Sequence, residues 1–287
     1  MTTANDELRH PAEVHINWNE SYYFNFFDHQ RELAGFFRIG LEENKQQSNM
    51  WCSFLHKGKV IYQRFRLNLP YTESGLEDLT VGGLRFRLVE ALETINISFS
   101  DRHLTCDLQW QGFHDVFDMR EEMTEMSDTV ANGHYEQSGN VTGRLGIGDA
   151  VFEIQGQGFR DHSWGVRDWE GIKIWKTCLG QFGNDFAFTA GEVMSIDGKT
   201  AYLGFIYDAG KLVSLRKTTV DLDDDTEPTV GTVILEEHNG AKTRIDLEFM
   251  QVCRMPYDFN VLQECYVKVR RGEEMVYGIV EVNRRLP

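Results

Sequence analysis

Hydrophobic and polar residues alternate along much of the chain with a period of two. Leu84, Phe86 and Leu88 alternate with the arginines at positions 85 and 87, and similar alternation recurs over residues 95–99 and 104–110. A period of two places successive side chains on opposite faces of a β-strand, so one face can pack on a core while the other meets water. The pattern predicts a chain built almost entirely of antiparallel strands.

Dipeptides that favour tight turns lie between the predicted strands. They are Lys57–Gly58, Asp197–Gly198, Ala209–Gly210, Asn239–Gly240 and Arg271–Gly272. Glycine readily reaches the left-handed backbone conformation that many short hairpins require, so these positions predict a series of β-hairpins. One short helix is expected around residues 119–126, where Arg, Glu and Met cluster without a β-branched residue until Thr124.

The length of the chain, 287 residues, suits two domains of ordinary size. Hydrophobic residues make up 41% of it, which is enough for a sizeable core. Residues 53–60 and 204–213 resemble each other, since each reads as an apolar strand that enters a Gly-Lys turn and leaves on a valine. We therefore expect two β-barrel or β-sandwich domains, residues 1–139 and 140–287, with the boundary in the polar segment 118–139.

The formal net charge of −16 argues against binding to nucleic acid or to an anionic membrane surface, since both need a basic face. No apolar stretch approaches the roughly 20 residues of a membrane-spanning helix. Residues 1–11 lack the pattern of a secretory signal. The five cysteines are scattered and form no CxxC pair, so we expect reduced thiols in a cytoplasmic protein.

Ionisable and aromatic side chains gather in residues 160–169, which read RDHSWGVRDW. Large rings exclude water, and a few polar groups among them can orient a ligand and transfer protons. The candidate catalytic residues are Asp161, His162 and Asp168, and the candidate substrate-binding residues are Arg160, Trp164, Arg167, Trp169, Tyr135 and Trp175. Neighbours on an extended strand point to opposite faces, so only one of Asp161 and His162 can face a substrate.

Other kinds of site are alternatives to proton transfer in residues 160–169. The arginines and aspartates of residues 160–169 could instead form ion pairs at a domain junction, with the tryptophans as core. A metal site is disfavoured, because Asp161 and His162 are adjacent and no HxH or HExxH sequence occurs. A serine nucleophile lacks a GxSxG elbow, and residues 156–158 (GQG) lack the third glycine of a dinucleotide-binding loop. No metal and no cofactor is therefore expected.

Four stretches of the chain resemble one protein superfamily. They are residues 134–143 (HYEQSGNVTG), 156–169 (GQGFRDHSWGVRDW), 18–28 (WNESYYFNFFD) and 277–281 (YGIVE). Together they resemble the carotenoid 1,2-hydratase (hydroxyneurosporene synthase) and AttH-like superfamily, in its uncharacterised bacterial branch. That superfamily also includes kievitone hydratase-like proteins and cofactor-free cyclases. The resemblance implies two lipocalin-like antiparallel β-barrel or sandwich domains packed together, a ligand cavity at or near their junction, and no organic cofactor.

The function expected from these observations is a cofactor-independent lyase, either a hydratase or dehydratase or a carbon–carbon-cleaving enzyme. It would use acid–base chemistry on a hydrophobic aromatic molecule, phenylpropanoid-dimer-like, or on an isoprenoid. Asp161 and His162 are the expected proton-transfer pair, and Tyr135, Trp164 and Trp169 would hold the substrate. Two alternatives stay open: a cofactor-free isomerase or cyclase, and a lipocalin-like carrier that leaves its ligand unchanged. The expected partner is a small molecule, and a homodimer is left open.

Overall fold

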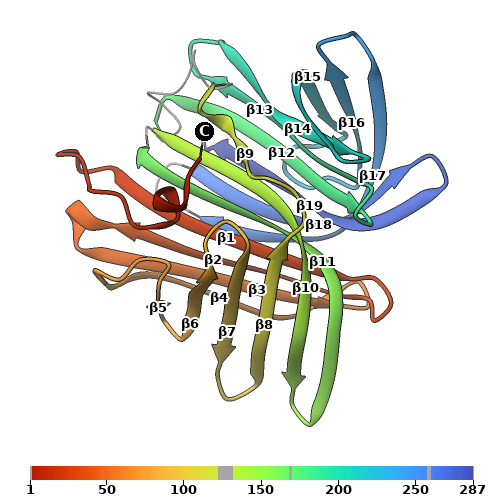
Figure 1. The fold of residues 1–287 in the computed structure, drawn as a ribbon. Helices are drawn as coiled ribbons and strands as arrows, with labels where there is room; N and C mark the ends of the chain where they lie inside the picture. Colours follow the sequence, from red (N-terminus) through yellow and green to blue (C-terminus); the bar gives the residue numbers. More distant parts are fainter. Residues whose placement is uncertain (1, 122–131, 168–169, 257–259, 287) are drawn as a thin grey trace. The chain divides into compact units, whose positions relative to one another are not determined.

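The computed structural model describes residues 2–121, 132–167, 170–256 and 260–286. The chain divides into two compact units, residues 1–118 with 131–167 and residues 119–130 with 168–287. Each unit is built on one antiparallel β-sheet, and both sheets are barrel-like (Figure 1). The predicted all-β fold with two barrel-like sheets is therefore confirmed.

The first unit holds an eleven-stranded sheet and two short 3-10 helices, η1 (Ala4–Glu7) and η2 (Glu43–Lys45). Its strands are β1 (Trp18–Asp28), β2 (Leu33–Glu42), β3 (Gln47–His56), β4 (Lys59–Pro70), β5 (Leu79–Val81), β6 (Leu84–Glu90), β7 (Thr94–Ser100), β8 (Leu104–Gly112), β9 (Phe117–Asp118), β10 (Gly133–Ile147) and β11 (Ala150–Val166).

The order of strands in this sheet is β4-β3-β2-β1-β11-β10-β8-β7-β6-β5, and β9 pairs with β10. Strand β1, near the N-terminus, therefore lies beside β11, which carries most of the predicted site segment. One face of the sheet packs around a large apolar cluster to which Tyr22, Phe24, Trp110 and Val141 belong. We call this the core face, and the other side of the same strands the opposite face.

The second unit is a closed barrel in which each strand pairs with the next and the last pairs with the first. Its strands are β12 (Ile172–Phe182), β13 (Phe186–Ser195), β14 (Thr200–Asp208), β15 (Lys211–Leu222), β16 (Val230–Glu237), β17 (Lys242–Pro256), β18 (Asn260–Arg271) and β19 (Glu274–Arg285). Aliphatic and aromatic residues such as Phe188, Val233 and Val267 form its buried core. Closure leaves none of the eight described strands of this unit with an unpaired edge.

The five predicted hairpin turns are confirmed, since each connects consecutive strands and its glycine has a φ between 61° and 90°. Of the helix expected at residues 119–126, a 3-10 turn, η3 (Met119–Glu121), is present, and the rest lies outside the described residues. The expected boundary after residue 139 lies within β10, which pairs with β11 and β8, and the first unit continues to residue 167. No helix in the described ranges is long and apolar enough to cross a membrane.

Candidate functional site

Three adjacent strands, β1, β11 and β10, bring the predicted site residues into register. In an antiparallel sheet, residues directly opposite each other point to the same side. Because Tyr22 and Phe24 belong to the apolar cluster, their partners also lie on the core face. The three rows on that face are Glu20–Trp164–Gly133, Tyr22–His162–Tyr135 and Phe24–Arg160–Gln137.

His162 lies in the middle row and is hydrogen-bonded through both ring nitrogens. Its Nε2 is 2.9 Å from Oε1 of Glu20, and its Nδ1 is 3.2 Å from the hydroxyl of Tyr135. An ionised carboxylate can only accept, so Nε2 carries the hydrogen and Nδ1 accepts from the Tyr135 hydroxyl. Only 1% of His162 is exposed, and this burial lowers its pKa in spite of the opposing effect of Glu20. The imidazole is therefore neutral and polarised between a phenol and a carboxylate.

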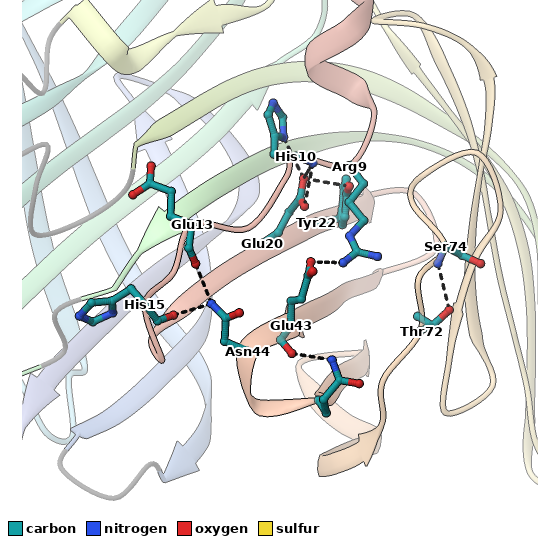
Figure 2. Close-up of polar contacts among 11 residues, drawn as sticks. Arg9, His10, Glu13, His15, Glu20, Tyr22, Glu43, Asn44, Thr72 and Ser74 are labelled. Carbon is teal, nitrogen blue, oxygen red and sulfur yellow. Dashed lines mark hydrogen bonds and ion pairs between the residues drawn. The ribbon is translucent and has the colours of Figure 1, made fainter.

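Glu20 is the carboxylate on which these contacts converge. It accepts hydrogen bonds from the backbone N–H and Nδ1 of His10, from the hydroxyl of Tyr22 and from His162. Figure 2 shows His10 and Tyr22 meeting at Glu20. Burial raises the pKa of Glu20, but the hydrogen bonds from His10 and His162 outweigh it and lower the pKa to about 2. Glu20 thus stays ionised although it is almost fully buried.

The N-terminal segment crosses the core face and contributes His10 to the group. The His10 ring stacks on the indole of Trp164, with the ring centroids 3.7 Å apart and the planes 8° from parallel. Gly133 makes room for that indole, since a Cβ on Gly133 would lie 2.2 Å from the Trp164 ring. The site segment and the N-terminal segment therefore depend on each other for their positions.

A buried ion pair occupies the third row of the core face. The Arg160 guanidinium contacts both carboxylate oxygens of Glu7 in η1, at 2.8 and 3.0 Å, and its Nε donates to the Gln137 amide oxygen at 2.9 Å. It also lies over the rings of Trp110 and Tyr135, 5.0 and 5.2 Å from their centroids. Arg160, expected to bind a substrate, is thus engaged by Glu7 of the same chain.

The opposite face of the same strands carries the remaining polar residues of the site segment. Ser163 Oγ accepts from the Arg167 guanidinium at 2.6 Å and lies 3.0 Å from Ser21 Oγ. His134 contacts Glu136 at 3.1 Å, and Glu136 lies directly opposite Asp161 in the ladder. Burial lowers the pKa of His134, but Glu136 outweighs it, and the net effect raises the pKa.

The structure therefore brings some of the predicted residues together and separates others. Tyr135, His162, Trp164 and Arg160 share the core face, whereas Asp161 and Arg167 belong to the opposite face. Trp175 lies in β12 of the second unit, where its indole N–H donates to Glu281 at 2.5 Å. Asp168 and Trp169 lie outside the described residues.

Five polar residues on the core face were not predicted as site residues, namely Glu7, His10, Glu20, Tyr22 and Gln137. Glu20 left a signal in the sequence, because it is the one carboxylate among the alternate residues of 18–26, which are otherwise aromatic. Glu7 and His10 lie outside any regular strand, and nothing in their spacing indicated that they would reach residues 160–164.

Two hollows of the first unit border the core-face residues, one at Gln137 and one at His10. One, of about 750 Å³, is lined by Leu92, Phe113, His114, Val116 and Gln137 among others. Gln137 holds Arg160, and Val116 packs against the cluster of Trp18, Tyr135 and Trp164. The other, a groove of about 430 Å³, is lined by Arg9, His10, Pro11, Glu43, Gln46, Tyr71 and Glu73. Ligand pockets commonly have volumes of roughly 300–1,000 Å³.

One group in the described residues has the composition of a metal site. A nitrogen of His10, a carboxylate oxygen of Glu20 and a nitrogen of His162 all lie within 4.8 Å of one another. No organic cofactor motif accompanies it in the sequence. As arranged, the group forms hydrogen bonds that can hold or pass protons.

Comparison with known proteins shows that solved structures share this fold. An AttH-like protein from Nitrosomonas europaea has a TM-score of 0.69 at 12% identity, covering 94% of this chain and 93% of that one. CghA with bound Sch210972 has a TM-score of 0.66 at 13% identity, covering 93% and 88%. Kievitone hydratase from Nectria haematococca has a TM-score of 0.66 at 10% identity, covering 92% and 88%. The expected AttH-like fold is thereby confirmed.

No curated protein matches the sequence. A family model matches residues 3–286, nearly the whole chain, so the match includes both units and every residue of the site. The chain therefore belongs to the family described as a domain of unknown function, DUF7064.

Proposed function

We propose that this protein is a cofactor-independent lyase, a hydratase or dehydratase or a carbon–carbon-cleaving enzyme, with proton transfer centred on His162. Its substrate would be a hydrophobic aromatic or isoprenoid small molecule. The observation that supports this function best is the chain of hydrogen bonds Tyr135–His162–Glu20, buried on the core face. Kievitone hydratase, one of the proteins with the same fold, is a hydratase by name.

The Tyr135 hydroxyl is the member of the chain suited to act on a substrate. When its oxygen takes a proton from the substrate, its own proton passes to Nδ1 of His162, and in the reverse direction the imidazolium returns that proton to Tyr135 as Tyr135 protonates the substrate. Glu20 holds the imidazole in the tautomer that leaves Nδ1 free to accept, and it stabilises the imidazolium that forms. This is the division of labour between acid–base group and orienting carboxylate that many hydrolytic sites use.

The surroundings of the relay suit an apolar substrate. Tyr22, Tyr135 and Trp164 supply aromatic rings around His162, with Tyr22 stacked on it at 4.2 Å between centroids. Electron-rich ring faces stabilise a cationic intermediate, such as a protonated alkene, by about 0.5–2 kcal/mol each. We propose the hollow beside Gln137 as the substrate cavity, since its wall residue Val116 packs against the cluster that contains Tyr135.

The test is to incubate the purified protein with kievitone and with a panel of aromatic and isoprenoid alkenes in water labelled with oxygen-18. Mass spectrometry then detects the incorporated oxygen or the reverse loss of water. The substitution His162→Gln removes the acid–base group and should slow any turnover by about 10²–10⁴-fold. The matched control is the neighbouring Asp161→Asn on the opposite face, which should change turnover less than about tenfold. Turnover that survives in His162→Gln and disappears in Asp161→Asn would refute the assignment.

A further inference from the structure

His10, Glu20 and His162 come from three separate parts of the chain and direct their nitrogen and oxygen atoms to one point. We propose that these three residues form a binding site for one divalent transition-metal ion, of the kind that zinc represents. The inference goes beyond the proposed reaction and does not depend on it, because it concerns binding in the absence of substrate.

The set of donor atoms selects the class of ion. Two imidazole nitrogens and one carboxylate oxygen are ligands that zinc takes in sites with three protein ligands, where a water completes the tetrahedron. Calcium and magnesium prefer sites made of oxygen atoms alone, so they fit this group poorly.

The spacing of the donors is close to what such an ion needs. Nδ1 of His10 and Nε2 of His162 each lie 2.9 Å from Oε1 of Glu20. With metal–ligand distances of about 2.0–2.1 Å, ligand atoms in a tetrahedral site are about 3.3 Å apart. The two nitrogen–oxygen separations therefore have to widen by only about 0.4 Å when an ion replaces the hydrogens that the three groups now share. The two nitrogens, which lie within 4.8 Å of each other, have to adopt the same spacing of about 3.3 Å.

Neighbouring residues hold the ligands in the orientation that a metal requires. The Tyr135 hydroxyl contacts the far nitrogen of His162, the Tyr22 hydroxyl contacts Glu20, and the Trp164 indole stacks on His10. Contacts of this kind to the outer side of metal ligands fix ring orientation. When an ion binds Nε2 of His162, the hydrogen of the ring moves to Nδ1, and the Tyr135 hydroxyl can accept it instead of donating. The side chains are therefore already oriented, and what must change is the position of the hydrogens that His10 and His162 now donate to Glu20.

An ion can reach the group from the surface. The side chain of His10 is 19% exposed, whereas that of Glu20 is 2% exposed. His10 also lines the groove beside Arg9, Glu43 and Tyr71. The groove leads solvent to His10, so it supplies both the path of entry and the water for the fourth coordination position.

Metal binding has a consequence for the relay described above. A bound ion would take Nε2 of His162 and Oε1 of Glu20, the two atoms that share a hydrogen in the relay. The ion-loaded and proton-relaying states of this group therefore exclude each other.

The experiment uses the full chain without an affinity tag, stripped with a chelator and titrated with Co²⁺ and then Zn²⁺. We expect one Co²⁺ per chain, with the visible absorption of tetrahedral coordination, and its displacement by Zn²⁺. His10→Ala should weaken binding by more than about 100-fold, because even outer contacts to ligands are worth about 10–100-fold. His15→Ala is the matched control, because His15 lies exposed on the same segment. The affinity of this variant for Co²⁺ should be unchanged.

Glu20→Gln provides a second variant, checked for folding by circular dichroism, and should also lose the Co²⁺ spectrum. Absence of one-to-one binding in the unaltered chain, or binding of equal strength in His10→Ala, would overturn the inference. Both measurements are made without substrate, so they stand whether or not the proposed reaction is found. Conversely, loss of turnover in Tyr135→Phe with Co²⁺ binding retained would separate the relay from the ion site.

Discussion

Strands β1, β11 and β10 carry polar residues on both faces, and the ionisable residues of the two faces differ in exposure and in the number of their partners. On the core face, Glu20, His162 and Arg160 are at most 2% exposed, and each has several partners. On the opposite face Ser163 and Glu136 are also buried, but His134, which pairs with Glu136, keeps 18% of its side chain exposed. A buried network is stabilising only while all its members are paired, whereas a group near water can exchange a lost partner for solvent. The core face is therefore the place where single substitutions should matter most.

The largest effect is expected from separating Arg160 and Glu7. Removing one partner of a buried ion pair leaves an uncompensated charge, which costs about 3–5 kcal/mol. Arg160→Met and Glu7→Gln should each lower the free energy of unfolding by that amount, and the Tm by on the order of 10 °C. Urea unfolding and calorimetry measure the two quantities.

The matched control is Arg144→Met in the same β10–β11 hairpin. Arg144 pairs with Glu153, but the two side chains are 72% and 63% exposed, so the loss should stay below about 1 kcal/mol. The double variant Arg160→Met with Glu7→Leu should recover much of the stability lost in the single ones, because no buried charge is left unpaired. Equal losses at the buried and exposed pairs would contradict the distinction drawn between the faces.

Next in size is the response of the core face to acid. The pKa of Glu20 is lowered from an ordinary 4.5 to about 2, so between these pH values Glu20 is protonated in the unfolded chain and ionised in the folded chain. The stability that Glu20 contributes is present above pH 4.5 and is lost as the pH falls toward 2. The lowered pKa of His162 acts in the same direction below about pH 6.5. Unfolding free energies measured from pH 7 to 3 should therefore fall.

Two variants assign this acid response to the two groups. Glu20→Gln should be less stable at pH 7, and its stability should fall less between pH 4.5 and 3 than that of the unaltered chain. His162→Gln should lose the earlier part of the decline, which begins below about pH 6.5. If both variants kept the full acid response, other carboxylates would carry it and the core face would not.

The same contrast explains what could be predicted from the sequence. Strands and hairpin turns were predicted well, because alternation and Gly-containing dipeptides are local, as at Lys57–Gly58. The site was predicted in part. Residues 160–164 were recognised from their composition, but the alternation of a strand sends His162 to one face and Asp161 to the other.

The partners of these residues could not be predicted, for a physical reason. His162 meets Glu20, 142 positions away, and Arg160 meets Glu7, 153 positions away. Those contacts depend on the pairing of β1 with β11 and on the path of the N-terminal segment, neither of which has a local sequence signal. For the same reason, the metal-type group of His10, Glu20 and His162 has no recognisable spacing.

The smallest effect is expected on the opposite face, and it should have the opposite sign. The pKa of His134 is raised because its contact with Glu136 outweighs burial, so the folded chain holds a proton that the unfolded chain releases. That contribution is fully present below the unfolded pKa of about 6.5 and is lost as the pH rises through the folded pKa. His134→Gln should therefore flatten a shallow decline in stability above pH 6.5, by on the order of 1 kcal/mol for the one hydrogen bond concerned, and leave the acid response intact. The two faces of one set of strands would then differ in the direction of pH change that destabilises them. A His134→Gln variant whose stability changed its response below pH 6.5 instead would show that the titrations of the two faces are coupled through the sheet.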